Sequence, residues 1–395
     1  MPTMTAPSPL AQAVTERVRT VVGTRRVALH EPIFQGNEWA YVKECLDTGW
    51  VSSVGSYVDR FERDLAAYTG AAHAVVVSNG TSGLQVALQL VGVGHGDEVI
   101  IPALSFVATA NAVRHCGAWP HFADIDAATL GLGVQALDEY LGSVLEYRGS
   151  ASVNRHSGRR VAAIVPMHTF GHPVDMPELM AVAGRHGIPV VEDAAESLGS
   201  FIEGRHTGTF GVFGLLSFNG NKIITTGGGG ALITNDGQLA RRAKHITTTA
   251  KQPHPWAFVH DEVAYNYRMP NLNAALGCAQ LEQLCSFLQS KRLLAQRYAN
   301  AFADLPQARL FLERPGTQVN YWLQTLILES SVADERDAVL AATNEAGLMT
   351  RPVWELLNTL AMYRECASAP LPVATDLARR IINLPSSPQL LQEPA

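Results

Sequence analysis

The chain has 395 residues, of which 47% are hydrophobic and 17% are charged, and 30 basic against 36 acidic residues give a formal net charge of −6. This composition excludes extended disorder, because it supplies enough apolar side chain for a large core. The acidic balance and the lack of a Lys/Arg-rich run argue against a nucleic-acid-binding surface.

The cysteines and the apolar runs bear on the compartment. Five cysteines stand far apart, none in a CxxC pair, which argues against a structural zinc site and favours free thiols in a reducing cytosol. The first residues lack the apolar core of a signal peptide, and no run reaches the length of about 18 apolar residues that a membrane span needs. We therefore expect a soluble cytoplasmic protein that binds neither nucleic acid nor membrane.

Between residues 10 and 192, helical patterns come to alternate with short apolar segments. Helices are predicted at 10–22, 36–49, 57–70, 84–91, 106–115, 134–147 and 176–186. Strands are predicted at 74–77, 98–101, 119–124, 161–166 and 189–192, and the polar stretch 148–160 is predicted to be a surface loop. Near-continuous apolar strands that alternate with helices predict a mainly parallel sheet covered on both faces.

The second half of the chain changes character. The Gly- and Thr-rich residues 198–214 favour hairpins, and further elements are predicted as strands at 215–218, 231–234, 321–328 and 349–353 and as helices at 237–246, 272–288, 291–305 and 333–345. The helix-rich end indicates a smaller α+β domain. We expect an N-terminal extension at 1–29, a large α/β domain at 30–270 and a small domain at 271–395.

Residues 78–83, Ser-Asn-Gly-Thr-Ser-Gly, lie between a predicted strand and a predicted helix. The first turn of a helix offers unpaired N–H groups and a partial positive charge, which suit a phosphate. Gly80 would let the backbone approach that group, and the hydroxyls of Thr81 and Ser82 would donate to it. An ordinary N-cap explains the same residues, since Ser, Thr and Asn are favoured there.

Two further residues combine a reactive group with an apolar setting. Asp193 ends a predicted strand, at the sheet edge where α/β proteins bind ligands, and it suits a base, a metal ligand, the partner of a protonated ring nitrogen or a simple N-cap. Lys222 lies in a stretch without other charges; if buried it can form a Schiff base, and if not it extends to the surface. Gly227–Gly230 follow, but without the GK[ST] of a Walker A loop they indicate a tight turn.

Residues 265–271, YNYRMPN, place an amide and a guanidinium just before the long helices, where a plain domain linker is equally possible. His168 and His172 have the spacing of metal ligands, but no third ligand accompanies them. We therefore predict no metal site.

In this order, SNGTSG, EDAAES and SFNGNKIITTGGGG resemble the DegT/DnrJ-type sugar aminotransferases, fold-type I enzymes that use pyridoxal 5′-phosphate (PLP) and act on nucleotide-linked keto sugars. The resemblance extends over residues 30–388 and includes NEWAYVKECLDTGWVSS, PMHTFGHPVDM, YNYRMPNLNAALG and RIINLPSS. It implies a large α/β domain on a mainly parallel, seven-stranded mixed sheet, and a smaller C-terminal α+β domain.

The resemblance also implies roles for single residues. Lys222 matches the Schiff-base lysine, and Asp193 matches the carboxylate that pairs with the pyridine nitrogen. Phe106 matches the aromatic residue that stacks on the cofactor ring. Asn266 matches the amide that reaches the phosphate in the neighbouring subunit of a homodimer, with Arg268 assisting. Further cofactor contacts are expected at Gly80, Thr81, Ser82, Ser217 and Asn219.

Glu196 stands where many relatives carry Gln or His, beside the phenolic oxygen of the cofactor. A glutamate occurs in the branch that resembles perosamine and legionaminic-acid pathway aminotransferases. Because a phenolate would repel an ionised carboxylate, we expect Glu196 to be protonated or to bind a neighbouring donor. The chain departs from common family motifs at Gly228, Gly229 and Pro270.

Within the family, a lysine at the Schiff-base position implies transamination, whereas a histidine signals dehydration. We expect transfer of an amino group from an amino acid, glutamate, to C4 of a nucleotide-linked 4-keto-6-deoxy-hexose, a 2-acetamido sugar on UDP or GDP, for surface polysaccharides. Sugar contacts are expected at Trp50, Val51, Ser52, His168 and Arg351. The alternatives are a 3-keto-sugar aminotransferase of the same family and a PLP-binding regulatory protein, although residues 1–30 are too short for the DNA-binding extension of a regulator.

Overall fold

This computed structural model describes residues 7–149 and 151–391. In these residues the large domain is built on a mixed sheet of seven strands in the order β3-β2-β6-β7-β10-β11-β1. A parallel bridge between Ile164 and Val190 joins the two parts of the sheet. Strand β11 is antiparallel to both neighbours, and the other pairs are parallel. The strands are β1 (His73–Val77), β2 (Glu98–Pro102), β3 (Trp119–Ala123), β6 (Val161–Ile164), β7 (Val191–Asp193), β10 (Phe213–Ser217) and β11 (Gly230–Thr234). The predicted mainly parallel, seven-stranded mixed sheet is confirmed.

Helices cover both faces of this sheet because successive strand residues point to opposite sides. Val75 and Leu215 pack in the core beneath α4, α5 and α8. Their neighbours Val76 and Leu216 pack in the core beneath α3 and α9 (Asn271–Phe302). Helices α6 and α7 cover the side of β2 to which Ile100 points. The helices are α3 (Ser56–Thr69), α4 (Gly80–Leu90), α5 (Val107–His115), α6 (Val134–Val144), α7 (Met176–Arg185) and α8 (Gly237–Thr247).

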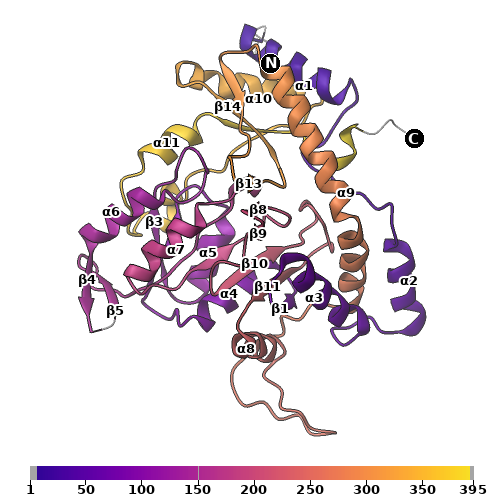
Figure 1. The fold of residues 1–395 in the computed structure, drawn as a ribbon, viewed down its shortest axis with the longest axis vertical. Helices are drawn as coiled ribbons and strands as arrows, with labels where there is room; N and C mark the ends of the chain where they lie inside the picture. Colours follow the sequence, from indigo (N-terminus) through magenta and orange to yellow (C-terminus); the bar gives the residue numbers. More distant parts are fainter. Residues whose placement is uncertain (1–6, 150, 392–395) are drawn as a thin grey trace.

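Helix α9 (Asn271–Phe302) links the two domains, and it is one continuous helix where the sequence predicted two. Its first half packs on α3 and α2 (Glu38–Thr48), and its second half packs on α1 (Pro9–Val22), as Figure 1 shows. Within the predicted N-terminal extension, the apolar face of α1 joins the core of the small domain. The domain bounds themselves stay a prediction.

The small domain contains an antiparallel sheet in the order β12-β14-β16-β15. Its elements are β12 (Ala308–Leu310), β14 (Gln324–Leu328), β15 (Arg351–Pro352), β16 (Ile381–Leu384), α10 (Arg336–Glu345) and α11 (Pro372–Ala378). This arrangement matches the small α+β domain expected at the C-terminal end.

Two connecting regions contain short hairpins. The prediction of a surface loop at 148–160 is wrong in part, because β4 (Leu145–Arg148) pairs with β5 (Ala151–Asn154) to form a hairpin. Side chains of β5 bind distant groups there: the Ser152 hydroxyl donates to the His186 carbonyl, and the Asn154 amide donates to Glu98. The expected hairpin after residue 198 is present, as β8 (Phe201–Ile202) and β9 (Arg205–His206), and β13 (Thr317–Gln318) extends it.

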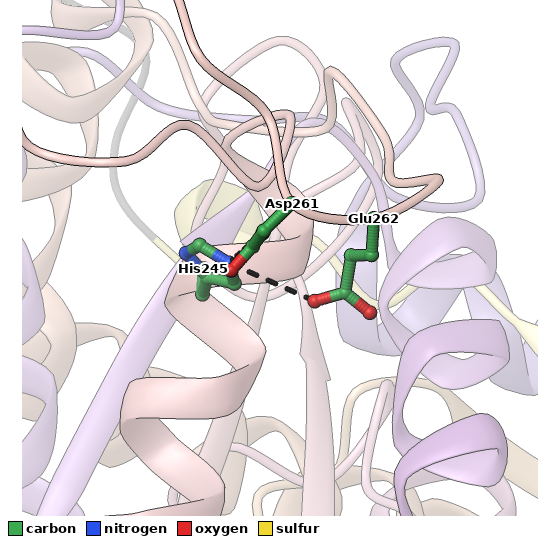
Figure 2. Close-up of side chains that lie close together, drawn as sticks. All are labelled: His245, Asp261 and Glu262. Carbon is green, nitrogen blue, oxygen red and sulfur yellow. Dashed lines mark hydrogen bonds and ion pairs between the residues drawn. The ribbon is translucent and has the colours of Figure 1, made fainter.

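Residues 248–266, which we call the arm, extend from α8 away from the body of the molecule (Figure 1). Antiparallel bridges join Thr248 to Asn266 and Lys251 to His260. At its base, His245 Nε2 of α8 lies 2.8 Å from Asp261 Oδ1 and 3.6 Å from Glu262 Oε1 (Figure 2). Glu262 also pairs with Arg242, so ion pairs fasten the returning strand of the arm to α8.

Among the described residues, no helix is long and apolar enough to cross a bilayer. The thiols of all five cysteines are free, as the sequence predicted. The cytoplasmic location stays a prediction.

Alanine substitutions at Gly214 and Gly142 should change the stability of the protein in opposite directions. A Cβ added at Gly214 of β10 would lie 2.1 Å from the backbone oxygen of Gly208, whereas a Cβ at Gly142 of α6 would meet nothing within 4 Å. Gly214→Ala should therefore lower the free energy of unfolding by about 1–3 kcal/mol, because backbone must move. Gly142→Ala should raise it by about 0.5–1 kcal/mol, because glycine is a poor residue inside a helix. Denaturant unfolding measures both, and equal effects would contradict the packing at β10.

Candidate active site

A cavity of about 330 Å³ lies where β7 and β10 end and α4 begins. This volume falls in the range typical of small-molecule sites. The cavity brings together most of the residues singled out in the sequence: Gly80, Thr81, Phe106, Asp193, Glu196, Ser217, Asn219 and Lys222. Trp322 and Trp354 of the small domain complete its wall.

The start of α4 forms one end of the cavity. Asn79 caps this helix, and its Oδ1 accepts a hydrogen bond of 2.8 Å from the Ser82 backbone N–H. Ser82 is thus part of the cap and is not among the cavity-lining residues, whereas Gly80 and Thr81 line the cavity. A Cβ at Gly80 would lie 3.5 Å from Ser217 Oγ, so the helix start and the end of β10 meet closely. First-turn N–H groups and nearby hydroxyls make this end suited to an anion.

Asp193 forms the buried floor of the cavity at the end of β7. Its Oδ2 accepts a hydrogen bond of 2.7 Å from the Thr109 hydroxyl, and its Oδ1 accepts one of 3.2 Å from the Ala195 N–H. Burial raises the pKa of Asp193, while the two donors and the charge of Lys222 act in the opposite direction. A cationic ring nitrogen placed here would favour the ionised carboxylate.

Lys222 lies on the loop that follows β10. The loop is closed by backbone hydrogen bonds from Thr226 N–H to Phe218 O and from Phe218 N–H to Gly229 O. The next two residues, Ile223 and Ile224, are buried in the core between the sheet and α9. This apolar anchor holds the loop in place, while the side chain of Lys222 reaches the cavity and stays 12% exposed.

The amino group of Lys222 meets the carboxylate of Glu196 in the cavity. Lys222 Nζ lies 3.2 Å from Glu196 Oε1, and Glu196 Oε2 accepts a hydrogen bond of 2.9 Å from the Phe170 N–H. Burial raises the pKa of Glu196 to about 7, and the nearby Lys222 charge opposes that rise. Glu196 therefore binds neighbouring donors, which is one of the two outcomes expected from the sequence.

The two residues expected from the YNYRMPN segment lie outside the cavity lining. The guanidinium of Arg268 is buried and binds Glu62 Oε1 of α3 at 2.6 Å and the Val76 carbonyl at 3.2 Å. These contacts hold the segment against α3 and β1, and the cofactor role expected for Arg268 stays a prediction. Asn266 is exposed at the base of the arm.

The expected sugar contacts are also outside the cavity lining. His168 is fully buried: its Nδ1 accepts from the Val174 N–H, so its Nε2 donates to Glu192, and both ring nitrogens are occupied. The Arg351 guanidinium binds the Asn344 side chain and the Thr350 carbonyl. Trp50, Val51 and Ser52 lie together near the start of α9, where the Ser52 carbonyl accepts from the Asn271 N–H.

The cavity residues fit PLP on several counts. The α4 end suits its phosphate, the buried carboxylate of Asp193 suits a protonated ring nitrogen, and Lys222 supplies the amine. Phe106 lines the cavity beside Trp354 and is 46% exposed, so its aromatic ring is only partly covered. These groups therefore suit four different parts of the cofactor: the phosphate, the ring nitrogen, the aldehyde that an amine binds and the face of the ring.

Sequence reasoning missed Thr109, Trp322 and Trp354. Thr109 follows Phe106 by three residues, so one helical turn from a recognised residue was an available signal. The two tryptophans come from the small domain, more than 90 residues beyond Lys222 in the chain. Nothing in their local sequence connects them with the site.

Comparison with known proteins agrees with this geometry. The model of the DegT/DnrJ/EryC1/StrS aminotransferase family matches residues 32–395. GDP-perosamine synthase of Vibrio cholerae is 36% identical over 371 residues, covering 93% of this chain and 95% of that protein. The GDP-perosamine synthase of Escherichia coli O157:H7 is also 36% identical, with 93% and 95% covered.

Solved structures extend the likeness to the fold. The aminotransferase TlmJ from Streptoalloteichus hindustanus superposes with a TM-score of 0.82 at 30% identity, covering 92% of this chain and 94% of that one. S. venezuelae DesV superposes with a TM-score of 0.79 at 28% identity, covering 98% and 95%. This chain belongs to the DegT/DnrJ/EryC1/StrS aminotransferase family and is a PLP-dependent sugar aminotransferase.

Proposed function

We propose that the enzyme moves an amino group from glutamate to C4 of a nucleotide-linked 4-keto-6-deoxy-hexose, a 2-acetamido sugar on UDP or GDP, for amino-sugar and surface polysaccharide synthesis. The observation that carries the proposal is the contact of Lys222 with buried Glu196, in one cavity with Asp193 and with the start of α4, which suits an anion. Relatives named GDP-perosamine synthase support a nucleotide-linked sugar as the acceptor.

The roles of the residues follow from their contacts. When bound, the cofactor withdraws electrons from Cα of the amino donor and carries the amino group between the two half-reactions. Asp193, oriented by Thr109, stabilises positive charge on the ring nitrogen. Lys222 accepts the proton from Cα and delivers it to the cofactor C4′, and Glu196 provides a nearby carboxylate for the resulting ammonium.

Lys222→Ala should abolish amine transfer and the yellow absorption of the lysine-bound cofactor, because the only proposed Schiff-base amine is removed. The spectrum is recorded before and after glutamate, and then with a panel of nucleotide-linked 4-keto and 3-keto sugars. Lys43→Ala, which changes an exposed lysine of α2, should behave as the wild type. A colourless wild type in the presence of PLP, or near-normal turnover of Lys222→Ala, would contradict the proposal.

The same panel separates the alternatives. A 3-keto sugar that restores the yellow colour after glutamate has bleached it would favour the 3-aminotransferase. A protein that binds PLP and does not turn over any member of the panel would favour a regulatory role.

Glu196 should make stability depend on pH. Its pKa is raised from 4.5 to about 7, so between these values the folded protein keeps a proton that the unfolded chain has released. Stability therefore falls as pH rises through this window. Relative to the wild type, Glu196→Gln should gain on the order of 3 kcal/mol between pH 4 and pH 8. Denaturant unfolding of the cofactor-free protein measures this gain.

Glu345→Gln, at the exposed end of α10, is the matched control and should follow the wild-type pH dependence. Parallel pH curves for the wild type and Glu196→Gln would show that Glu196 ionises as an ordinary carboxyl group.

The active unit is proposed to be a homodimer in which Asn266 reaches the cofactor phosphate of the neighbouring subunit. What supports this is apolar exposure on the arm and beside α2. Trp256 of the arm is 80% exposed and Val263 is 98% exposed, while Trp39 and Trp50 near α2 are 82% and 59% exposed. Large apolar side chains gathered on projecting elements are typical of protein–protein contacts.

Asn266→Ala should weaken PLP binding roughly tenfold, because one hydrogen bond to a charged phosphate is lost. The dissociation constant is measured by titrating the yellow absorption, and the dimer by analytical ultracentrifugation. Asn300→Ala, an exposed asparagine of α9, is the control. If Asn266→Ala holds PLP as tightly as the wild type, the assignment to the neighbouring site is withdrawn.

A further inference from the structure

Trp322 of the small domain contacts the amino group of Lys222 directly. Lys222 Nζ lies 3.7 Å from the centroid of the Trp322 ring, on the ring face. The indole Nε1–H donates a hydrogen bond of 2.7 Å to the carbonyl of Asn221, the residue that precedes Lys222. Trp322 is only 5% exposed. The ring is therefore tied to the same loop that carries the lysine.

The backbone of Trp322 is held from both sides. Its N–H donates to Asn320 Oδ1 at 2.8 Å, and its carbonyl accepts from the buried amino group of Lys291 at 3.1 Å. The preceding residue, Tyr321, has a φ of 49°, a backbone conformation that residues other than glycine rarely adopt. Such strain persists where surrounding contacts determine the conformation, and it concentrates at functional sites.

The same segment is fastened to Glu196. The Asn320 side-chain N–H₂ donates to the backbone carbonyls of Glu196 at 2.8 Å and Leu198 at 2.9 Å. Phe170, whose N–H binds Glu196, packs on the Trp322 ring with centroids 6.4 Å apart and is itself at φ of 56°. The ring and the carboxylate that contact Lys222 are thus linked to each other through Asn320 and Phe170.

We infer that Trp322 is a positioning residue for Lys222: its ring face and the Glu196 carboxylate together hold the freed ammonium of the lysine at the point of proton transfer. The inference rests on the PLP-dependent activity. In the first half-reaction the Cα–H bond of the amino donor breaks, its electron pair stays on the substrate–cofactor side, and the proton goes to the neutral amine of Lys222. The cation so formed contacts both a negative ring face and a carboxylate, and both attract it.

The test compares Trp322→Leu with the wild type in a single turnover, with glutamate or Cα-deuterated glutamate as the probe and loss of yellow absorption as the signal. Trp322→Leu should slow the loss roughly 30-fold, the factor that a desolvated cation–π contact supplies. The deuterium isotope effect should rise, because proton transfer becomes limiting, while the concentration of glutamate at half-maximal rate changes little. Trp322→Phe keeps a weaker ring face and should slow the loss only several-fold.

A second readout uses no amino donor. PLP is added to the cofactor-free protein, and the amine of Lys222 condenses with the aldehyde to form one C=N bond and release one water. Trp322→Leu should slow the appearance of the yellow absorption, because the amine is no longer held in the cavity. Trp119→Leu is the matched control, since Trp119 of β3 lies under Arg114 and Arg159 and does not line the cavity. It should follow the wild type in both readouts.

Equal rates and isotope effects for Trp322→Leu and the wild type would overturn the inference. So would a slower rate with an unchanged isotope effect, which marks a purely structural role. If Trp322→Leu does not fold, the isotope effect of Trp322→Phe is compared with that of the wild type, and an unchanged value overturns the inference. A wild type that turns yellow with PLP but does not react with glutamate would refute the proposed donor. The rate of condensation with PLP would still test the role of Trp322.

Discussion

Three carboxylates are buried within five consecutive residues, at Glu192, Asp193 and Glu196, and the structure depends on giving each of them donors. An unpaired buried carboxylate costs several kcal/mol, so the chain around them has little freedom. Glu192 accepts hydrogen bonds from the N–H groups of Gly208, Phe210 and Gly211, which fixes the turn before β10. These hydrogen bonds position the start of β10, the strand that leads into the loop of Lys222.

The other two carboxylates also take donors from further away in the chain. Asp193 binds Thr109 of α5, and Glu196 binds Lys222 and the backbone of Phe170. Each partner belongs to a different segment, so satisfying the carboxylates also assembles the site. The raised pKa of Glu196, about 7, reflects how fully it is buried and makes its proton responsive near neutral pH.

Residue patterns singled out several residues that the structure brings into one cavity, where each stands in a distinctive local setting. Gly80 and Thr81 follow a strand and begin a helix, and Lys222 stands in an uncharged stretch, so their setting was readable from neighbouring residues. Local pattern says less where a side chain has several possible partners. Ser82 serves the cap of α4, and Arg268 turns to Glu62, because these nearer partners satisfy their polar groups.

The sequence by itself determined the alternating strands and helices, the mainly parallel sheet and the reactive residues at its edge, because periodicity and turn residues act over short distances. Only the tertiary structure decided that Trp322 lies on Lys222, that Asn320 holds Glu196, and that α1 joins the small domain. These contacts join residues far apart in the chain, and they depend on how α9 sets one domain against the other. Local pattern carries no information about that geometry, which is fixed by packing.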